Sequence, residues 1–155
     1  MSEPREIICV CYANICRSPM AEAILQQALD LRFGAGTFTV TSAGIQARPG
    51  LPADPGSVAA LGKRGLDASR HQSSLLTKER AERAWRIYAM EEYQAQWIRS
   101  LIGSAGTIHV WGEEIPDPIG GSRRRFEGAA ALIERSLPSI LDDIAAALAA
   151  EGSRA

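Results

Sequence analysis

Hydrophobic residues occur along this chain in short runs that alternate with amphipathic stretches. The continuous apolar run at residues 7–11 predicts a strand that is buried on both faces. A Ser18-Pro19 pair, typical of a helix start, is followed by apolar residues at helical spacing. The same criteria predict further strands at residues 38–44, 85–90 and 107–111, and helices at 54–64, from 77, at 91–101 and at 125–150, the last broken near Pro138.

The alternation of strands and helices predicts an α/β fold, with a four-stranded parallel sheet and helices on both of its faces. In such sheets, ligands bind beyond the carboxyl ends of the strands. Cys11 lies at that end of the first predicted strand. The loop that follows it is therefore the first candidate for a functional site.

Composition narrows the classes of function. A net charge of -1 over 155 residues gives no general attraction to nucleic acid or to anionic membranes, and we expect Arg123–Arg125 to be the exposed first turn of a helix. No run approaches the roughly 18 apolar residues of a transmembrane helix, and the first residues lack the pattern of a signal peptide. All three cysteines lie before residue 17, unlike a secreted disulfide framework. The length of the chain predicts one domain over residues 1–155. From the placement of the cysteines we expect the protein to be in the reducing cytoplasm.

The loop after the first predicted strand combines groups that bind anions. Five residues separate Cys11 from Arg17, so the chain must curl there and its backbone N–H groups converge. The helix predicted to begin at Ser18 adds the positive end of its dipole, and Arg17 can donate two hydrogen bonds to phosphate oxygens. The same groups, with a hydrogen bond from Ser18, are expected to keep Cys11 as a thiolate, the form of cysteine that acts as a nucleophile. This spacing predicts a phosphate-binding loop that carries a nucleophile.

Outside this loop, two residues are candidates for proton transfer. Asp117, which Pro118 follows in a glycine-rich loop, places a carboxylate on a mobile segment, where it can protonate a leaving oxygen. His71 is either a general base or a structural residue, and we favour the structural role because an ionised thiolate needs no base. Cys9 is assigned to the core, since no fourth ligand lies near the cysteines to complete a zinc site.

The segment VCYANICRSPMAEA resembles the signature of the low-molecular-weight protein tyrosine phosphatases, usually written C-x-G-N-I-C-R-S-P. The resemblance extends to TSAG at 41–44, GLDASRHQSSLLT at 65–77, IYAM at 87–90 and DP at 117–118. It implies a four-stranded parallel sheet, a phosphorylated protein as substrate, and catalysis without a metal or another cofactor.

The resemblance also implies residue roles. Cys11 would attack phosphorus, Arg17 would hold the equatorial oxygens, and Asp117 would protonate the leaving oxygen and then activate water. The residues of the phosphate-binding loop would be Tyr12, Ala13, Asn14, Ile15, Cys16 and Ser18, with Ser42 and His71 supporting the loop through a hydrogen-bond network with Asn14. In the family the pair matching Cys11 and Cys16 can form a reversible disulfide; alternatively, Cys16 is a small buried hydrophobic residue.

The chain departs from the family pattern at two places. Ala13 replaces the usual Gly, which would strain the backbone if φ is positive there, or otherwise crowd the loop. Ile119 replaces the aromatic residue that often follows Asp-Pro and that stacks on the phosphotyrosine ring. Tyr12 either provides an aromatic contact in its place or is a surface tyrosine.

These departures leave two alternatives to a phosphotyrosine phosphatase. The first is a protein-arginine phosphatase of the same fold, although these usually have Thr where this chain has Ile15, and a branched apolar residue favours an aryl ester. The second is a weakly active phosphate-binding regulatory module. An arsenate reductase is a poor match, because no resolving cysteine follows Cys16.

Overall fold

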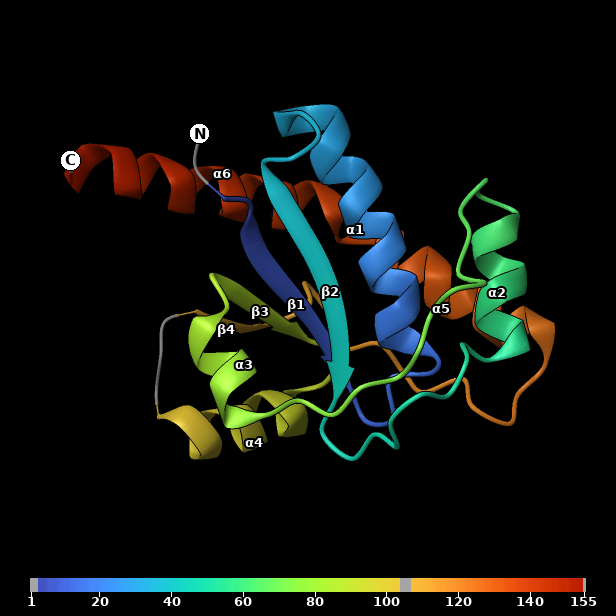
Figure 1. Ribbon diagram of the computed structural model, residues 1–155. Coiled ribbons are helices and arrows are strands. Elements are labelled where there is room, and N and C mark those ends of the chain that lie inside the picture. Colours follow the sequence, from blue (N-terminus) through green and yellow to red (C-terminus); the bar gives the residue numbers. More distant parts are fainter. Residues whose placement is uncertain (1–2, 104–106, 155) are drawn as a thin grey trace.

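A parallel sheet lies at the centre of the protein, whose computed structural model describes residues 3–103 and 107–154 (Figure 1). Within these residues the sheet has four strands in the order β2-β1-β3-β4, and all neighbouring pairs are parallel. The strands are β1 (Arg5–Cys11), β2 (Phe38–Gly44), β3 (Arg86–Ala89) and β4 (Ile108–Val110). The predicted fold class is therefore confirmed.

Helices cover both faces of the sheet. They are α1 (Arg17–Phe33), α2 (Pro55–Gly62), α3 (Lys78–Arg83), α4 (Glu92–Ile102), α5 (Arg123–Arg135) and α6 (Leu137–Arg154). Figure 1 shows α1, α5 and α6 on one side of the sheet and α3 and α4 on the other. No helix within the described ranges is long and apolar enough to cross a membrane.

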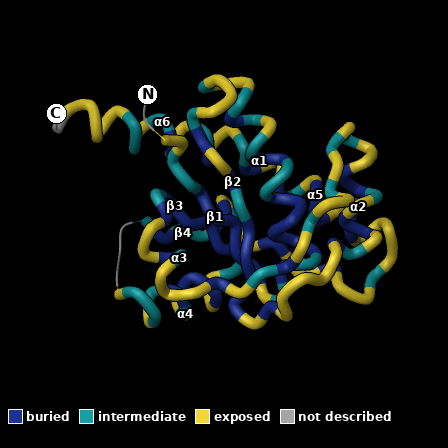
Figure 2. The backbone as a smooth tube through the Cα atoms, viewed as in Figure 1, coloured by how far each residue is buried: buried dark blue, intermediate teal, exposed yellow. Residues whose placement is uncertain are grey.

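Strand β1 contributes to a hydrophobic core on each face, as its continuous apolar sequence predicts. Because successive side chains of a strand point to opposite faces, Ile7, Cys9 and Cys11 pack in the core beneath α1, α5 and α6. Ile8 and Val10 pack in the core beneath α3 and α4. The whole run is buried, with at most 2% exposure, and Figure 2 shows the strands as the buried centre of the molecule. The assignment of Cys9 to the core is confirmed.

Side-chain caps mark the starts of several helices. Asp54 accepts a hydrogen bond from the Gly56 N–H at the start of α2, and Thr77 does the same for Arg80 in α3. The predicted helix 125–150 is two helices, α5 and α6, which meet at Ser136 just before Pro138. Proline is tolerated in a first turn, where its missing N–H would have no helical partner.

Two expectations about helix starts have different outcomes. Helix α1 begins at Arg17, one residue before the start predicted at Ser18. Residues 123–125, by contrast, form the exposed first turn of α5 as expected.

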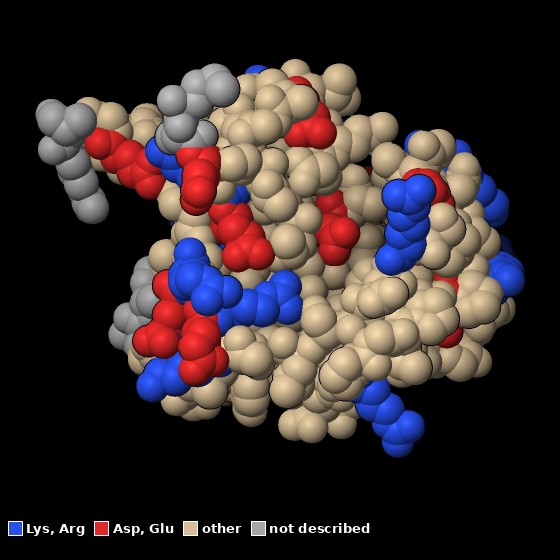
Figure 3. All heavy atoms as spheres, in the orientation of Figure 1, with Lys and Arg blue, Asp and Glu red and all other residues tan. Residues whose placement is uncertain are grey.

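On the face shown in Figure 3, acidic and basic side chains lie in mixed groups, so charge is locally balanced there.

The start of β1 and the end of α6 lie together, at the end of the sheet opposite the loop 12–16 (Figure 1). Arg5 donates a hydrogen bond to Glu151 at 2.7 Å, and the Trp85 indole N–H donates to the same carboxylate at 2.5 Å. These contacts fasten the C-terminal helix to the first strand.

Gly44 at the end of β2 is required by a close backbone approach. A Cβ added there would lie 2.6 Å from the backbone oxygen of Tyr12 and 2.9 Å from the carbonyl carbon of Ala13. We predict that Gly44→Ala lowers the free energy of unfolding by about 1–3 kcal/mol, the usual cost of overpacking, as measured by urea denaturation. The control is Gly62→Ala, because a Cβ at Gly62 meets open space, so stability should be kept or increased. Equal stability of the two variants would contradict this interpretation.

Candidate active site

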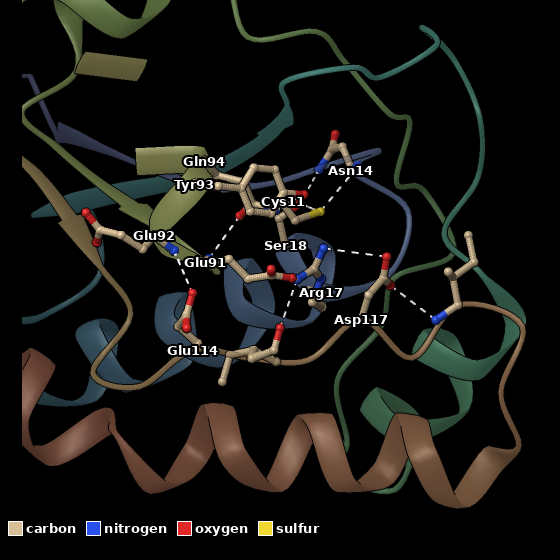
Figure 4. Close-up of polar contacts among 12 residues, drawn as sticks. Cys11, Asn14, Arg17, Ser18, Glu91, Glu92, Tyr93, Gln94, Glu114 and Asp117 are labelled. Carbon is tan, nitrogen blue, oxygen red and sulfur yellow. Dashed lines mark hydrogen bonds and ion pairs between the residues drawn. The ribbon is translucent and has the colours of Figure 1, made fainter. Parts of the chain in front are cut away.

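The loop between β1 and α1 wraps around the sulfur of Cys11. The Ser18 hydroxyl lies 3.0 Å from Sγ, and the backbone N–H of Asn14 donates to Sγ at 3.3 Å. All three residues are buried. The loop thus places a backbone N–H and a hydroxyl against the sulfur (Figure 4).

Asn14 holds the loop in shape. Its φ of 60° is left-handed, a conformation that asparagine adopts more readily than most residues. Its side chain donates to the Ser18 hydroxyl at 2.7 Å and accepts from the Ser74 N–H at 3.0 Å. Its backbone oxygen lies 2.7 Å from Nε2 of His71. A fully buried amide therefore connects the nucleophile loop to the segment 71–74.

The predicted support network is present in a modified form. His71 contacts Asn14 directly, but the Ser42 hydroxyl donates to Glu22 at 2.6 Å. Ser42 reaches the network through its carbonyl, which accepts from the Ser74 hydroxyl at 3.2 Å. Ser74 is thus the partner that sequence reasoning missed, since nothing distinguishes it from its neighbour in the SS pair at 73–74.

Ala13 does not strain the backbone. Among the non-glycine residues that the structure describes, Asn14 is the one with a positive φ. The first of the two expected effects of Ala13 is therefore wrong. Its side chain instead helps to line the small cavity around the nucleophile, whose walls are Cys11, Ala13, Ile15, Cys16, Arg17, Asp117 and Ile119. We call this cavity the catalytic cup.

Arg17 places a buried cation beside Cys11, with which it lines the cup. Its side chain is 2% exposed, and its Nη1 donates to the Ile115 carbonyl at 2.8 Å and to the Glu91 carboxylate. Burial opposes the charged form, but Cys11, Asp117 and Glu91 outweigh it and raise the pKa of Arg17. The guanidinium therefore remains charged.

The remaining side of this guanidinium is available to an anion. Its Nε is buried and has no hydrogen-bond partner among the described residues. Its Nη2 lies 3.6 Å from the Asp117 carboxylate. A buried donor without a partner costs free energy, and two adjacent guanidinium donors match two oxygens of a phosphate. Glu91 turns this fork of donors toward the catalytic cup.

Asp117 reaches the catalytic cup from the loop after β4. Its side chain is 38% exposed, and its carboxylate accepts from the Ile119 N–H at 3.1 Å. The fold thus brings together the three predicted catalytic residues Cys11, Arg17 and Asp117 (Figure 4). Glu91 was interpreted from the sequence only as a helix start, although its place at the carboxyl end of a strand was a signal for a site residue.

The other two cysteines are neutral thiols. Burial, followed by the charges of Asp54 and Asp117, raises the pKa of Cys16 to about 12. Burial, followed by the charge of Glu22, also raises the pKa of Cys9. Neither forms a disulfide in the structure. Cys16 therefore lines the cup as a protonated side chain rather than as a second nucleophile.

Two large side chains in this region are exposed: Ile119, which lines the catalytic cup, and Tyr12, which follows Cys11 in the chain. Tyr12 is 47% exposed and Ile119 is 52% exposed. The Tyr12 backbone oxygen accepts from the Gln46 N–H at 2.9 Å, which fastens its main chain to the loop after β2. Tyr12 therefore has a fixed backbone and an exposed ring.

Comparison with known proteins finds relatives over almost the whole chain. A family model described as low molecular weight phosphotyrosine protein phosphatase matches residues 6–153. The chain is 38% identical over 138 residues to a probable low molecular weight protein-tyrosine-phosphatase, EpsP, of Ralstonia solanacearum, an alignment that covers 86% of this chain and 91% of that protein.

Solved structures with this fold include Vibrio vulnificus Wzb in complex with benzylphosphonate, with a TM-score of 0.81 and 30% identity over 90% of this chain and 98% of that one. The YwlE arginine phosphatase from Geobacillus stearothermophilus has a TM-score of 0.82 and 27% identity, over 92% of this chain and 94% of that one.

The contact between Glu91 and Arg17 predicts a difference between two variants at Glu91. Both Glu91→Gln and Glu91→Ala remove the negative charge, but only Gln keeps an oxygen that can accept from the guanidinium. Since one hydrogen bond contributes about 1 kcal/mol or more, we expect Glu91→Ala to bind orthophosphate or vanadate about tenfold more weakly than Glu91→Gln. Isothermal titration calorimetry measures both affinities, and equal values would show that Glu91 does not orient Arg17.

Proposed function

Because this chain belongs to the low molecular weight phosphotyrosine protein phosphatase family, we propose that it hydrolyses phosphotyrosine in proteins through a covalent phosphocysteine at Cys11. One observation carries this proposal: three functional groups line the same cup. They are the sulfur of Cys11, which lies within hydrogen-bond distance of Ser18, the buried guanidinium of Arg17, whose Nε has no partner among the described residues, and the carboxylate of Asp117. These are the nucleophile, the phosphate-binding cation and the proton donor that phosphomonoester hydrolysis requires.

In the first step, a lone pair of the Cys11 thiolate attacks phosphorus. The bond between phosphorus and the ester oxygen breaks, and its electron pair leaves on that oxygen. Asp117, in its protonated form, donates a proton to the oxygen, so that a neutral phenol departs. The products of this step are the phenol and a phosphoryl group on sulfur.

In the second step, water hydrolyses the phosphocysteine. Asp117, now a carboxylate, accepts a proton from the water as the oxygen attacks phosphorus. The bond between phosphorus and sulfur breaks and its electrons return to Cys11 as the thiolate. Orthophosphate then leaves, and Asp117 is again protonated for the next cycle.

Positive charge in the catalytic cup stabilises the phosphoryl group in both steps. It comes from Arg17, from the converging N–H groups of the loop and from the N-terminus of α1, which begins at Arg17 itself. We therefore expect the reaction to need no metal ion. A nucleophile that works as a thiolate also suits a reducing compartment such as the cytoplasm.

Turnover of aryl phosphates in the presence of EDTA tests this mechanism. We expect wild-type protein to hydrolyse p-nitrophenyl phosphate, Cys11→Ser to be inactive, and Cys16→Ser to retain activity as the matched control. Asp117→Asn should lose about 10²–10³-fold in kcat with phenyl phosphate. The loss should be smaller with p-nitrophenyl phosphate, since p-nitrophenolate leaves without a proton.

The outcomes separate the alternatives. Activity that survives in Cys11→Ser would rule out the phosphocysteine. A wild-type protein that binds vanadate without hydrolysing any ester would favour the regulatory phosphate-binding module. Activity that EDTA abolishes and added metal restores would contradict the absence of a metal requirement.

A protein-arginine phosphatase is the second candidate function, because YwlE, which has the same fold, is an arginine phosphatase. Ile15 bears on the choice, since it lines the catalytic cup with an apolar side chain, which suits an aromatic ring better than a charged guanidinium. We expect kcat/KM to be higher for a phosphotyrosine peptide than for the matching phosphoarginine peptide. Replacing Ile15 with Thr should reduce this ratio severalfold, and a ratio below one in the wild type would reverse the assignment.

A further inference from the structure

A second cavity lies directly beside the catalytic cup. It is a groove of about 450 Å³ between the loop that carries Asp117 and one face of α5. Its lining residues are Pro116, Asp117, Pro118, Arg125, Gly128, Ala129 and Leu132. We call it the α5 groove. Its volume is within the range of ligand-binding sites in proteins.

The α5 groove is largely apolar because α5 contributes mainly small and apolar residues to its lining. The spacing of Arg125, Gly128, Ala129 and Leu132 places them on one face of α5, and the two smallest leave the space open. A Cβ added at Gly128 would meet no atom within 4 Å. Pro116 and Pro118 form the opposite wall, so the only charged groups of the lining are Asp117 and Arg125.

Asp117 makes the α5 groove continuous with the catalytic cup. The same side chain borders both cavities, so one residue separates a molecule in the cup from one in the groove. A peptide whose phosphorylated side chain occupies the cup advances by about 3.3–3.6 Å per residue when extended. Side chains one to three residues away from the phosphorylated one are therefore within reach of the groove.

We propose that the α5 groove binds an apolar side chain of the protein substrate, within three residues of the phosphorylated residue. This inference rests on the proposed phosphatase function. Burying most of a leucine side chain in an apolar site strengthens binding by about tenfold or more. The groove would thus add sequence preference to a catalytic cup that recognises the phosphate.

Charge at the end of the groove disfavours a second copy of this chain as the occupant. The exposed arginines at 123–125 lie at the start of α5, where Arg125 borders the groove. A two-fold symmetric dimer through this patch would contain these arginines twice, which raises the positive charge of the contact. A substrate chain has no such repulsion.

The test uses phosphotyrosine peptides in which Leu replaces Ala in turn at each of the three positions on either side of the phosphotyrosine. Binding is measured by fluorescence anisotropy in the Cys11→Ser background, and kcat/KM in proteins with Cys11. Gly128→Leu fills the α5 groove. Gly62→Leu is the matched control, because it places the same side chain on α2, where an added Cβ also meets open space.

We expect Leu at one position or more to strengthen binding and raise kcat/KM about tenfold over the Ala peptide. Gly128→Leu should abolish this gain, Gly62→Leu should keep it, and both should hydrolyse p-nitrophenyl phosphate within about twofold of the unsubstituted protein. Circular dichroism checks that both variants fold.

The inference would be overturned if no position favours Leu, if Gly128→Leu keeps the gain, or if light scattering shows a dimer that Gly128→Leu dissociates. An equal loss on p-nitrophenyl phosphate and on peptides would also overturn it, since the substitution would then act through Asp117. Failure of the proposed function is distinguishable, because an inactive wild type can still show, or lack, a binding preference for Leu.

Discussion

The buried guanidinium of Arg17 is the constraint on which the site depends. A charge that is almost fully removed from water is costly unless partners surround it, and the fold provides them from separate segments. Glu91 is the residue just before α4, in the turn that follows β3. Ile115 and Asp117 come from the loop after β4. Because β3 lies between β1 and β4 in the sheet, these partners reach Arg17 from one side, while the nucleophile loop encloses it from the other. The cation therefore organises the same segments that it would use in binding phosphate.

Much of this arrangement follows from local sequence. The apolar run at residues 7–11 predicts a strand buried on both faces, and the strand-helix alternation predicts an α/β fold; the structure confirms both. The short spacing between Cys11 and Arg17 predicts a curled loop, and the structure places this loop around the Cys11 sulfur. Parallel strands also place their carboxyl ends at one edge, which is why Asp117, remote in sequence, could be assigned to the same site. The helix from 125 to 150 was correctly expected to break, because proline disrupts a helix interior.

What could not be predicted depends on side-chain contacts across the sheet. The pairing of Glu91 with Arg17 and the role of Ser74 need the lateral order of the strands, which a sequence pattern does not determine. The backbone at position 13 illustrates the same limit. An alanine in place of glycine is compatible with two conformations, and only the fold shows that the left-handed residue is its neighbour Asn14.

The position of the chain ends has a practical consequence. Arg5 and Glu151 join the first strand to the last helix. From Arg5, β1 runs to Cys11, a distance of about 20 Å at the usual rise of a strand. An affinity tag, a fluorescent fusion partner or a covalent link to a solid support can therefore be attached at either end without covering the reactive sulfur. In an immobilised preparation the catalytic cup would face the solution, whichever end was used for attachment.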